Sequence, residues 1–169
     1  IYETSSLFES VIYALEGKVN SISILEMDSI ERNQLVLSLK KLISYYILRG
    51  RDSSQDLELK DDIEEYCKKL EDEEFVGGPS ELKILSQHYE AEFFVVQLTK
   101  HGIFPWYPIK QGKPSRRVYL FYDCRDGNKK YGVIVGNNRL NANPEDDVVS
   151  FVAGDKNVEK AVLKILKGL

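Results

Sequence analysis

The chain has 169 residues, of which 43% are apolar and 30% are charged, and its formal net charge is −4. This length suits one domain with a sizeable core, and an acidic balance without a concentrated basic patch disfavours nucleic acid as a main partner. No apolar run reaches the ~20 residues that span a bilayer and no secretory signal opens the sequence, so we expect no membrane partner.

We expect residues 1–169 to form a single domain excised from a longer chain, and N-terminal targeting stays open because the sequence starts at Ile1. Cys67 and Cys124 lie far apart, without a CxxC spacing or a neighbouring histidine. This pattern predicts no metal site, and we expect no cofactor. The same cysteine usage favours a reducing compartment, cytoplasmic or nuclear.

The first predicted element, over residues 3–15, is a short polar loop that runs directly into an amphipathic helix, and that helix is predicted to begin at Ser6. Ser6 is a small hydroxyl residue of the type that begins helices. A helix N-terminus presents backbone N–H groups that stabilise developing negative charge, and many enzymes place their nucleophile there. Ser6 is therefore the first candidate for a reacting group.

Helices dominate the first half of the chain. Gly17 is placed to cap the first helix, and Asp28 followed by Glu31 resembles a capping box. The apolar periodicity predicts a long helix from there to Arg49, and a polar loop over residues 51–59 follows it.

A shorter helix is expected over residues 61–71, with Cys67 as a small buried residue rather than a nucleophile. The paired glycines Gly77 and Gly78, followed by Pro79, predict a tight turn into another helix.

Strands are expected mainly in the second half. The apolar run 93–96 predicts a strand buried on both faces, and residues 99–115 form a turn-rich excursion in which we expect Trp106 to plug the core. Residues 118–122 and 131–135 read as a hairpin with a long loop.

A further strand is expected over residues 148–152, and a final helix over residues 157–166. The inward face of that helix is predicted to carry Val158, Ala161, Val162, Ile165 and Leu166. This order of elements predicts an α/β or α+β fold with a small central sheet flanked by helices.

Three segments resemble the ovarian-tumour (OTU) family of papain-like cysteine deubiquitinases, in the branch that works with the AAA ATPase segregase. The family carries Asp-Asn-Ser-Cys-Leu-Phe before a helix, and residues 3–8 here are Glu-Thr-Ser-Ser-Leu-Phe. It carries Trp-Gly-Gly-x-x-Glu-Leu at a helix start, and residues 76–82 here are Val-Gly-Gly-Pro-Ser-Glu-Leu. Its Tyr-Asp-Gly-x-His-Tyr-Asp hairpin is similar to Tyr122-Asp123-Cys124 and, after extra residues, to residues 129–132. The resemblance implies the papain-like OTU fold.

The resemblance maps the nucleophile onto Ser6, the activating histidine onto Lys130, and the orienting residue onto Gly132. A cysteine deubiquitinase needs a thiolate, a histidine that activates it and a third group that orients the histidine. We therefore predict that no catalytic residue is intact. The oxyanion-side loop maps onto Glu3, Thr4 and Ser5.

Two catalytic alternatives stay open. The chain is an active OTU enzyme whose cysteine has been replaced by serine, or Ser6 is an unorthodox nucleophile. A Ser6–Lys130 dyad requires a lysine that is desolvated enough to be neutral. The polar composition of the loop before Lys130 predicts instead that this region is exposed to solvent. The two histidines, His88 and His101, do not match the family position.

The leading functional hypothesis is a catalytically inactive, pseudo-deubiquitinase domain that acts as a ubiquitin- or protein-binding adaptor or scaffold. The resemblance implies that ubiquitin or polyubiquitin would lie across residues 46–59 and 101–114 with its tail aimed at Ser6. The AAA ATPase segregase or another protein complex is a further expected partner. A purely structural role, with the acidic surface over residues 61–74 in a larger assembly, is the third hypothesis.

Overall fold

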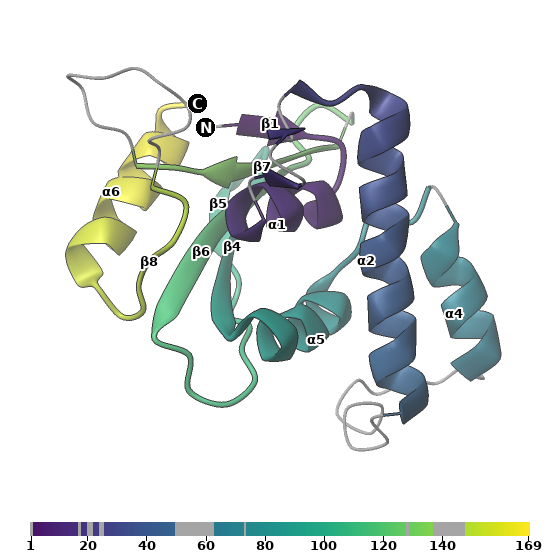
Figure 1. Cartoon of the computed structure of the whole chain (residues 1–169). Coiled ribbons are helices and arrows are strands. Elements are labelled where there is room, and N and C mark those ends of the chain that lie inside the picture. The colour runs from purple at the N-terminus through teal and green to yellow at the C-terminus, as the bar shows by residue number, and fades with distance from the viewer. Residues whose placement is uncertain are drawn as a thin grey trace.

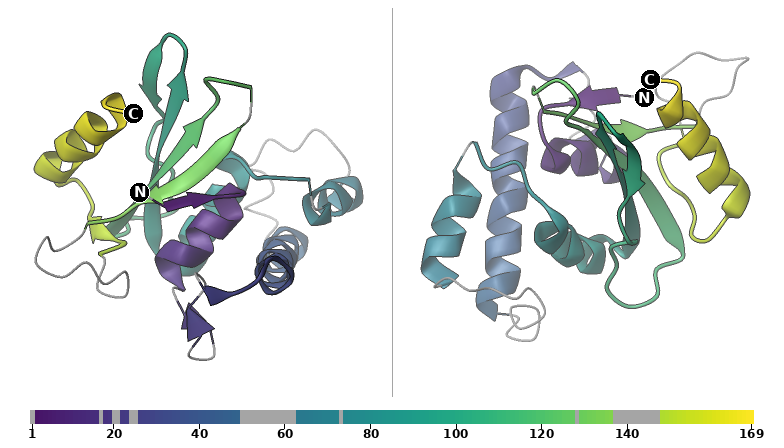
Figure 2. Two further views of the ribbon diagram at one scale, coloured as in Figure 1. Left: turned by 90° about the horizontal axis from the view of Figure 1, so that it is seen from above. Right: turned by 180° about the vertical axis from the view of Figure 1, so that it is seen from behind.

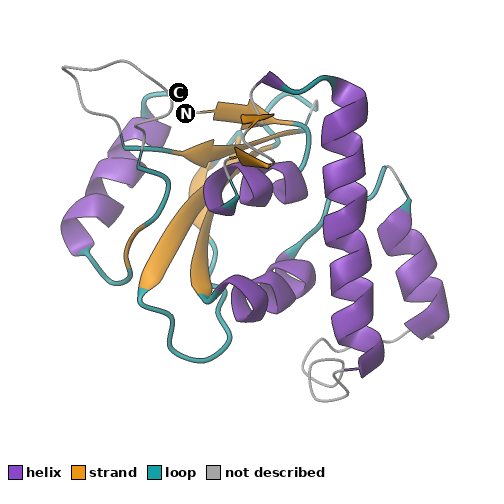
Figure 3. Cartoon of the chain, in the orientation of Figure 1, coloured by secondary structure: helices purple, strands orange, loops and turns teal. Residues whose placement is uncertain are grey.

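The computed structural model describes residues 2–16, 18–19, 22–23, 26–49, 63–72, 74–127, 129–136 and 148–169. They form a mixed sheet with helices on both faces (Figure 1, Figure 3), as the α/β prediction requires. Gly17, Gly50 and the predicted loop 51–59 lie outside the described residues.

Within the described residues, five strands lie side by side in one sheet, in an order that differs from their order in the sequence. Strand β4 runs parallel to β6, and the other neighbours in this row are antiparallel. A short strand, β8 (Phe151–Val152), adds to the outer end of β6. The row is β1 (Tyr2–Thr4), β7 (Lys130–Ile134), β6 (Arg116–Asp123), β4 (Ala91–Thr99) and β5 (Gly102–Pro105).

One face of the sheet is covered by α6 (Lys156–Lys167), and the other by α1 (Leu7–Leu15) and α5 (Pro79–Tyr89) (Figure 1). Figure 2 shows the long helix α2 (Ser29–Arg49) outside α1 and α5, with α4 (Ile63–Glu71) as the outermost element on that side. A separate two-stranded hairpin, β2 (Lys18–Val19) with β3 (Ile22–Ser23), follows α1.

Alternating residues of β4 explain why its sequence is apolar throughout. Phe93 and Val95 belong to the core beneath α1 and α5, whereas Phe94 and Val96 belong to the core beneath α6. Successive side chains of a strand point to opposite faces, so a strand covered on both sides needs an apolar residue at every position. The prediction of a strand buried on both faces is confirmed.

Three strand predictions need correction. The predicted polar loop before Ser6 is partly a strand, because residues 2–4 form β1. The turn-rich excursion contains β5, which pairs with β4 through its backbone. The predicted strand 148–152 shrinks to β8, and Val148 instead forms an isolated bridge with Gly136. Short edge strands need few apolar side chains, so hydrophobic patterning does not reveal them.

Two predictions about burial are also wrong in part. On α6, Val162 and Leu166 are buried, but Ala161 and Ile165 lie on the exposed side. Cys67 is half-buried rather than enclosed. Trp106, also half-buried, covers the core as predicted. Trp106 packs against the core and its Nε1 donates to Gln97 Oε1 at 3.1 Å, so it covers the core edge while keeping its indole N–H satisfied.

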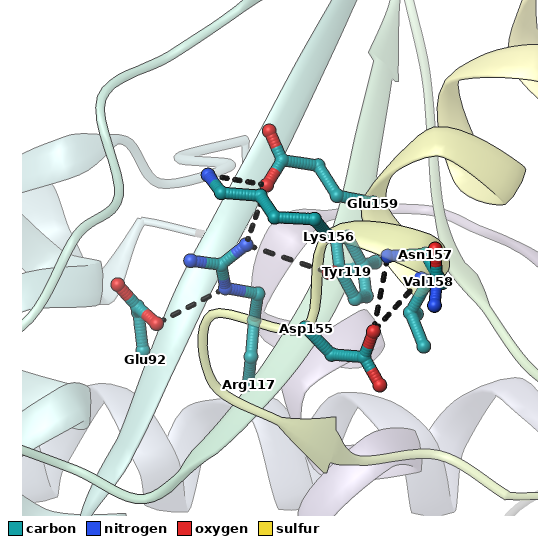
Figure 4. Close-up of polar contacts among 8 residues, drawn as sticks. All are labelled: Glu92, Arg117, Tyr119, Asp155, Lys156, Asn157, Val158 and Glu159. Atoms are coloured by element: carbon teal, nitrogen blue, oxygen red, sulfur yellow. Dashed lines mark hydrogen bonds and ion pairs between the residues drawn. The ribbon is translucent and has the colours of Figure 1, made fainter.

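A buried charged cluster fixes α6 to the sheet (Figure 4). The guanidinium of Arg117 donates from Nε to Glu92 Oε2 at 3.0 Å and lies 3.5 Å from Glu159 Oε2 on α6. It also lies over the ring of Phe94 and donates to the hydroxyl of Tyr119. We call these residues the Arg117 cluster, and its paired charges hold α6 over β4 and β6.

No helix in the part of the chain that the structure describes combines the length and apolar character needed to cross a membrane.

Candidate functional site

The fold brings the three OTU-like segments together at one end of the sheet. Strand β1 pairs with β7 so that Glu3 lies opposite Gly132 and Thr4 opposite Tyr131. Ser5 and Lys130 are the next residues beyond this pairing. The positions that the sequence mapped onto an OTU site are therefore neighbours in space.

The glycine turn, Gly77 and Gly78, lies beside the start of α1. The backbone N–H of Leu7, at the start of α1, donates to the carbonyl of Val76 at 3.3 Å. Gly77 has φ +87°, and a Cβ there would lie 2.9 Å from Cε2 of Phe8. Only glycine accepts this backbone conformation and this contact without strain, which explains the glycine at position 77.

Glu81 holds this turn in place, a role that its sequence position alone did not reveal. Its carboxylate is buried and accepts from the N–H of Gly78 at 3.1 Å and from the hydroxyl of Tyr66 at 2.8 Å. Burial, reinforced by the carboxylate of Glu81, raises the pKa of the Tyr66 phenol. The contacts of Glu81 join α4, the turn and the start of α5 into one unit.

Ser6, which the sequence predicted as the first residue of the helix, is instead its N-cap, and its side chain caps α1. Ser6 is only 7% exposed, and its Oγ accepts a hydrogen bond from the backbone N–H of Glu9 at 3.1 Å. Its carbonyl accepts from the N–H of Ser10 at 3.2 Å. A serine at an N-cap satisfies helix donors that have no partner within the helix.

The surrounding hydroxyls satisfy one another. Thr4 Oγ1 donates to the Ser6 carbonyl at 2.9 Å and lies 2.6 Å from Ser10 Oγ. Ser5 Oγ donates to Glu9 Oε2 at 2.6 Å. We call Thr4, Ser5, Ser6, Glu9 and Ser10 the Ser6 cluster; the sequence did not single out Glu9 and Ser10.

Three backbone donors at the start of α1 already have partners within the protein. The N–H of Leu7 donates to Val76, that of Glu9 to the Ser6 hydroxyl, and that of Ser10 to the Ser6 carbonyl. Donors that are already paired inside the protein contribute little to an oxyanion hole, which requires N–H groups aimed at the reacting oxygen.

Lys130 lies exposed at the start of β7. Its cross-strand neighbour Asp123 is engaged by Arg125, whose Nε and Nη2 donate to the two carboxylate oxygens at 2.9 and 2.8 Å. These hydrogen bonds from Arg125 lower the pKa of Asp123. Gly132, two residues beyond Lys130 on the same side of the strand, contributes no side chain. The ammonium of Lys130 is exposed to solvent among the residues that the structure describes.

Neither of the two histidines, His88 and His101, makes a hydrogen bond with the Ser6 cluster. His88 on α5 shares a hydrogen bond with the Tyr46 hydroxyl, 2.9 Å from its Nδ1, and packs edge-on against Tyr89. His101 lies in the exposed turn between β4 and β5, and β5 is at the opposite edge of the sheet from β1. Neither imidazole hydrogen-bonds to Ser6.

Three aromatic side chains, Tyr131, Tyr122 and Trp106, contact one another across the sheet, beginning at Tyr131, which lies opposite Thr4. The ring of Tyr131 stacks on that of Tyr122, with centroids 5.1 Å apart, and Trp106 meets Tyr122 edge-on. Burial, and secondarily Tyr122, raises the pKa of Tyr131 to about 12. Tyr131 is therefore a neutral packing residue, which anchors β7 beneath α1.

Comparison with curated proteins finds OTU1 ubiquitin thioesterases. The chain is 29% identical to the Xenopus laevis protein over 124 residues, which is 72% of this chain and 36% of that protein. It is also 29% identical to the Dictyostelium discoideum protein over 122 residues, 72% of this chain and 33% of that one. The chain thus matches about a third of the length of these relatives. No protein-family model matches the sequence.

Solved structures with the same fold are OTU domains. An ovarian tumor (OTU) domain in complex with ubiquitin superposes with a TM-score of 0.61 at 17% identity, covering 97% of this chain and 80% of that one. The OTUD1 OTU domain superposes with a TM-score of 0.53 at 13% identity, covering 79% and 85%. The chain is accordingly an OTU-like domain, in its fold and in its likeness to OTU1 ubiquitin thioesterases.

Proposed function

We propose that this OTU-like domain binds ubiquitin or polyubiquitin without cleaving it, and serves as an adaptor or scaffold. The observation that carries the proposal is the state of Ser6. Its hydroxyl accepts the N–H of Glu9 as an N-cap, and no imidazole hydrogen-bonds to it. A serine hydroxyl is a weak nucleophile unless an adjacent base takes its proton.

The surroundings of Lys130 support the same conclusion. A lysine acts as a base only when it is neutral, which requires burial or neighbouring positive charge. Lys130 is exposed, and Gly132 supplies no group to orient a base. The absence of a histidine at position 130 also weighs against a single cysteine-to-serine replacement as the full explanation.

The likeness to an OTU domain that was solved with ubiquitin supports ubiquitin as the ligand. On the OTU pattern, the tail of ubiquitin would approach Ser6. A second partner, the AAA ATPase segregase or another protein complex, is part of this proposal, as is a reducing cytoplasmic or nuclear location in keeping with the free Cys67 and Cys124. Purification of the protein with its partners from its native source, followed by mass spectrometry, tests the second partner.

Titration of isotope-labelled ubiquitin and of di-ubiquitins with the domain tests ligand binding. We expect ubiquitin resonances to shift at micromolar to submillimolar protein. No binding at near-millimolar concentration would reject ubiquitin as the ligand and leave the purely structural role.

A fluorogenic ubiquitin C-terminal substrate tests catalysis, and we expect no turnover. Turnover that Ser6→Ala abolishes would overturn the proposal in favour of an active OTU-type hydrolase. The double variant Ser6→Cys with Lys130→His, alone and with Gly132→Asp, probes the remaining framework. Activity that appears only in the repaired variants would mean that the framework survives and that the identities of these residues prevent cleavage.

A further inference from the structure

Helix α6 carries four lysines on one side, and they come together only when the helix forms. Lys156, Lys160, Lys164 and Lys167 follow one another at intervals of four, four and three residues. At about 100° per residue these positions fall within an arc of about 80° and extend over about 17 Å of the helix axis. The sequence shows no basic run here, because other residues separate the lysines. We call these four residues the α6 lysine stripe.

The stripe faces solvent. Figures 1 and 2 show α6 as the outermost element on its face of the sheet, and no other helix or strand that the structure describes covers its outer side. All four lysines are exposed, and the side chain of Lys156 is 77% exposed. Lys160, Lys164 and Lys167 make no ion pair with a residue in the described part of the chain. Their three ammonium groups are therefore available to a partner.

The one carboxylate within α6 is already engaged. Glu159 Oε2 lies 3.5 Å from Nη1 of Arg117 and 3.4 Å from Nζ of Lys156 (Figure 4), and its side chain is 22% exposed. Asp155, the N-cap of α6, accepts the N–H of Asn157 at 3.0 Å. Neither acid neutralises the lysines further along the helix.

Among the described residues, the strands packed on α6 supply no unpaired carboxylate. Glu92 of β4 pairs with Arg117 at 3.0 Å, and Asp123 at the end of β6 pairs with Arg125 at 2.8 Å. Strands β5 and β8 carry no charged residue. The charge of the stripe is thus not balanced from beneath.

The turns near the C-terminal end of α6 add further cations. Arg125 Nη1 donates to the carbonyl of Leu169 at 2.9 Å, which places the turn between β6 and β7 beside this end of the helix. Asp126 in that turn is exposed, and so is Lys129. Strand β5 contacts α6, and the turn before it contributes the exposed Lys100. The described surface around α6 is therefore positive, although the net charge of the chain is −4.

A small apolar strip borders the stripe. Ala161 and Ile165 lie one turn apart on the side of α6 next to Lys164, and Ile165 is 48% exposed. A partner with an aliphatic residue beside its carboxylates can cover this strip while the acids pair with the lysines.

The net charge distinguishes between anionic partners. A membrane surface or a long polyanion extends beyond the stripe and meets the rest of a chain that is acidic overall. A segment about as long as α6 meets mainly the lysines, because exposed charges more than about 10 Å apart are largely screened at an ionic strength of about 0.1 M. The phosphate backbone of a nucleic acid also offers no aliphatic group to Ile165. These features favour a short acidic protein segment.

We propose that the α6 lysine stripe binds an acidic segment of a partner protein, in which glutamate or aspartate recurs beside leucine or isoleucine. The carboxylates pair with Lys160, Lys164 and Lys167, and the aliphatic side chains pack on Ile165. Helices α6 and α1 cover opposite faces of the sheet (Figure 1), so this surface is separate from the Ser6 cluster. The proposal does not rest on ubiquitin binding.

Titration of the isotope-labelled domain with the peptide acetyl-ELAAELAAELAA-amide tests the site, because its glutamates repeat the spacing of the lysines. We expect the largest shifts at the Ile165 methyl groups and at the backbone amides of residues 160–167. Acetyl-QLAAQLAAQLAA-amide should bind about tenfold more weakly, and acetyl-ESAAESAAESAA-amide severalfold more weakly. Equal binding of the glutamate and glutamine peptides, or shifts centred away from α6, would overturn the proposal.

Variants at exposed positions locate the contact. Lys160→Gln combined with Lys164→Gln should weaken the glutamate peptide about tenfold, and Ile165→Ser should weaken it severalfold. Lys41→Gln combined with Lys68→Gln makes the same change in net charge at exposed lysines of α2 and α4, and should leave the affinity unchanged. An equal loss in this control would assign binding to overall charge and overturn the proposal.

Other occupants of the stripe have their own tests. Tighter binding to vesicles of equal parts phosphatidylcholine and phosphatidylserine, or to single-stranded oligothymidylate, than to the glutamate peptide would overturn the proposal. Residues 145–147, Glu-Asp-Asp, lie outside the described residues. Replacing them with Gln-Asn-Asn should leave the peptide affinity unchanged, whereas severalfold tighter binding would assign the stripe to this segment and overturn the proposal.

Ubiquitin titrations with the same variants separate this surface from the proposed function. Ubiquitin binding that is unchanged by Lys160→Gln with Lys164→Gln supports a distinct site. Equal loss of peptide and ubiquitin binding would assign α6 to the ubiquitin surface and overturn the inference. Peptide binding by a wild-type domain that does not bind ubiquitin supports the inference and rejects the proposed function alone.

Discussion

The Ser6 cluster and the Arg117 cluster both place polar side chains inside the protein, yet they differ in chemistry. The Ser6 cluster is built mainly of neutral hydroxyls around a helix start, with the single carboxylate of Glu9. The Arg117 cluster pairs a guanidinium with two carboxylates beneath α6 (Figure 4). The charged cluster joins β4, β6 and α6, whereas the hydroxyl cluster connects the end of β1 to the first turn of α1. Buried polarity alone does not mark a reactive site in this protein.

The largest expected loss of stability follows from removing Glu92, the ion-pair partner of Arg117. Glu92→Ala leaves the buried guanidinium without its 3.0 Å contact, and we expect a loss of about 3–5 kcal/mol in the free energy of unfolding. Urea denaturation measures it. Lys156→Ala is the control, because Lys156 is 77% exposed and should change stability by less than about 0.5 kcal/mol. Similar effects from both variants would contradict the structural role of the buried pair.

The glycine turn beside the Ser6 cluster gives the next effect. Gly77→Ala adds a Cβ 2.9 Å from Phe8 in a left-handed backbone, and we expect about 2 kcal/mol of destabilisation. Gly127→Ala is the matched control, since Gly127 also has a positive φ but no atom within 4 Å of the added Cβ. It should cost about 1 kcal/mol. A smaller loss at Gly77 than at Gly127 would argue against close packing of the turn on Phe8.

The Ser6 cap gives a smaller effect on stability. Ser6→Ala removes the acceptor for the N–H of Glu9, so we expect a loss of about 1 kcal/mol, whereas Ser6→Asp should retain most of the stability. Thermal and urea denaturation compare the three proteins. Equal destabilisation by alanine and aspartate would show that the side chain acts through packing rather than as a cap.

The smallest expected change in stability comes from the ion pair of Asp123 with Arg125, and its dependence on pH identifies it. Because Arg125 lowers the pKa of Asp123 in the folded state, the ionised carboxylate stabilises the fold above the unfolded-state pKa of about 3.9. This contribution is lost as the pH falls through the lowered, folded-state pKa. The difference in unfolding free energy between wild type and Asp123→Asn should be constant from about pH 5 to 7 and shrink below about pH 4.

Urea denaturation across this pH range measures the difference, with Asp126→Asn at an exposed position as the control. A difference that grows at low pH would contradict the ion pair as its source.

The sequence predicted the elements with strong periodicity. The amphipathic pattern located α1, and the capping residues located the starts of α2 and α5, where Asp28 accepts from the N–H of Glu31 and Gly78 precedes Pro79. The apolar runs located β4 and β6. These signals depend on neighbouring residues, so they can be read without knowing the fold.

The features that the sequence did not predict depend on contacts between residues that are distant in the chain. Strand β1 exists because β7 supplies a partner, and a polar three-residue segment has no pattern of its own. The start of the first helix near Ser6 was predicted from the apolar run that follows it, whereas the capping role of Ser6 is a finding of the structure. The contact of Glu81 with Tyr66 required the fold to bring α4 to the turn. The resemblance placed residues 3–5 and 130–132 in one site, and the pairing of β1 with β7 brings Glu3 opposite Gly132. The chemistry of Ser6 and Lys130 follows from exposure and hydrogen bonding.

The pairing of β1 with β7 also has a kinetic consequence. It joins the beginning of the described chain to residues 131–133, so the segment between the partners is most of the molecule. Closing such a long loop is entropically costly, and contacts between distant residues slow folding. During synthesis, β1 stays without its partner until β7 has left the ribosome. We therefore expect the strand that positions Ser6 to dock after the β4–β6 core has formed.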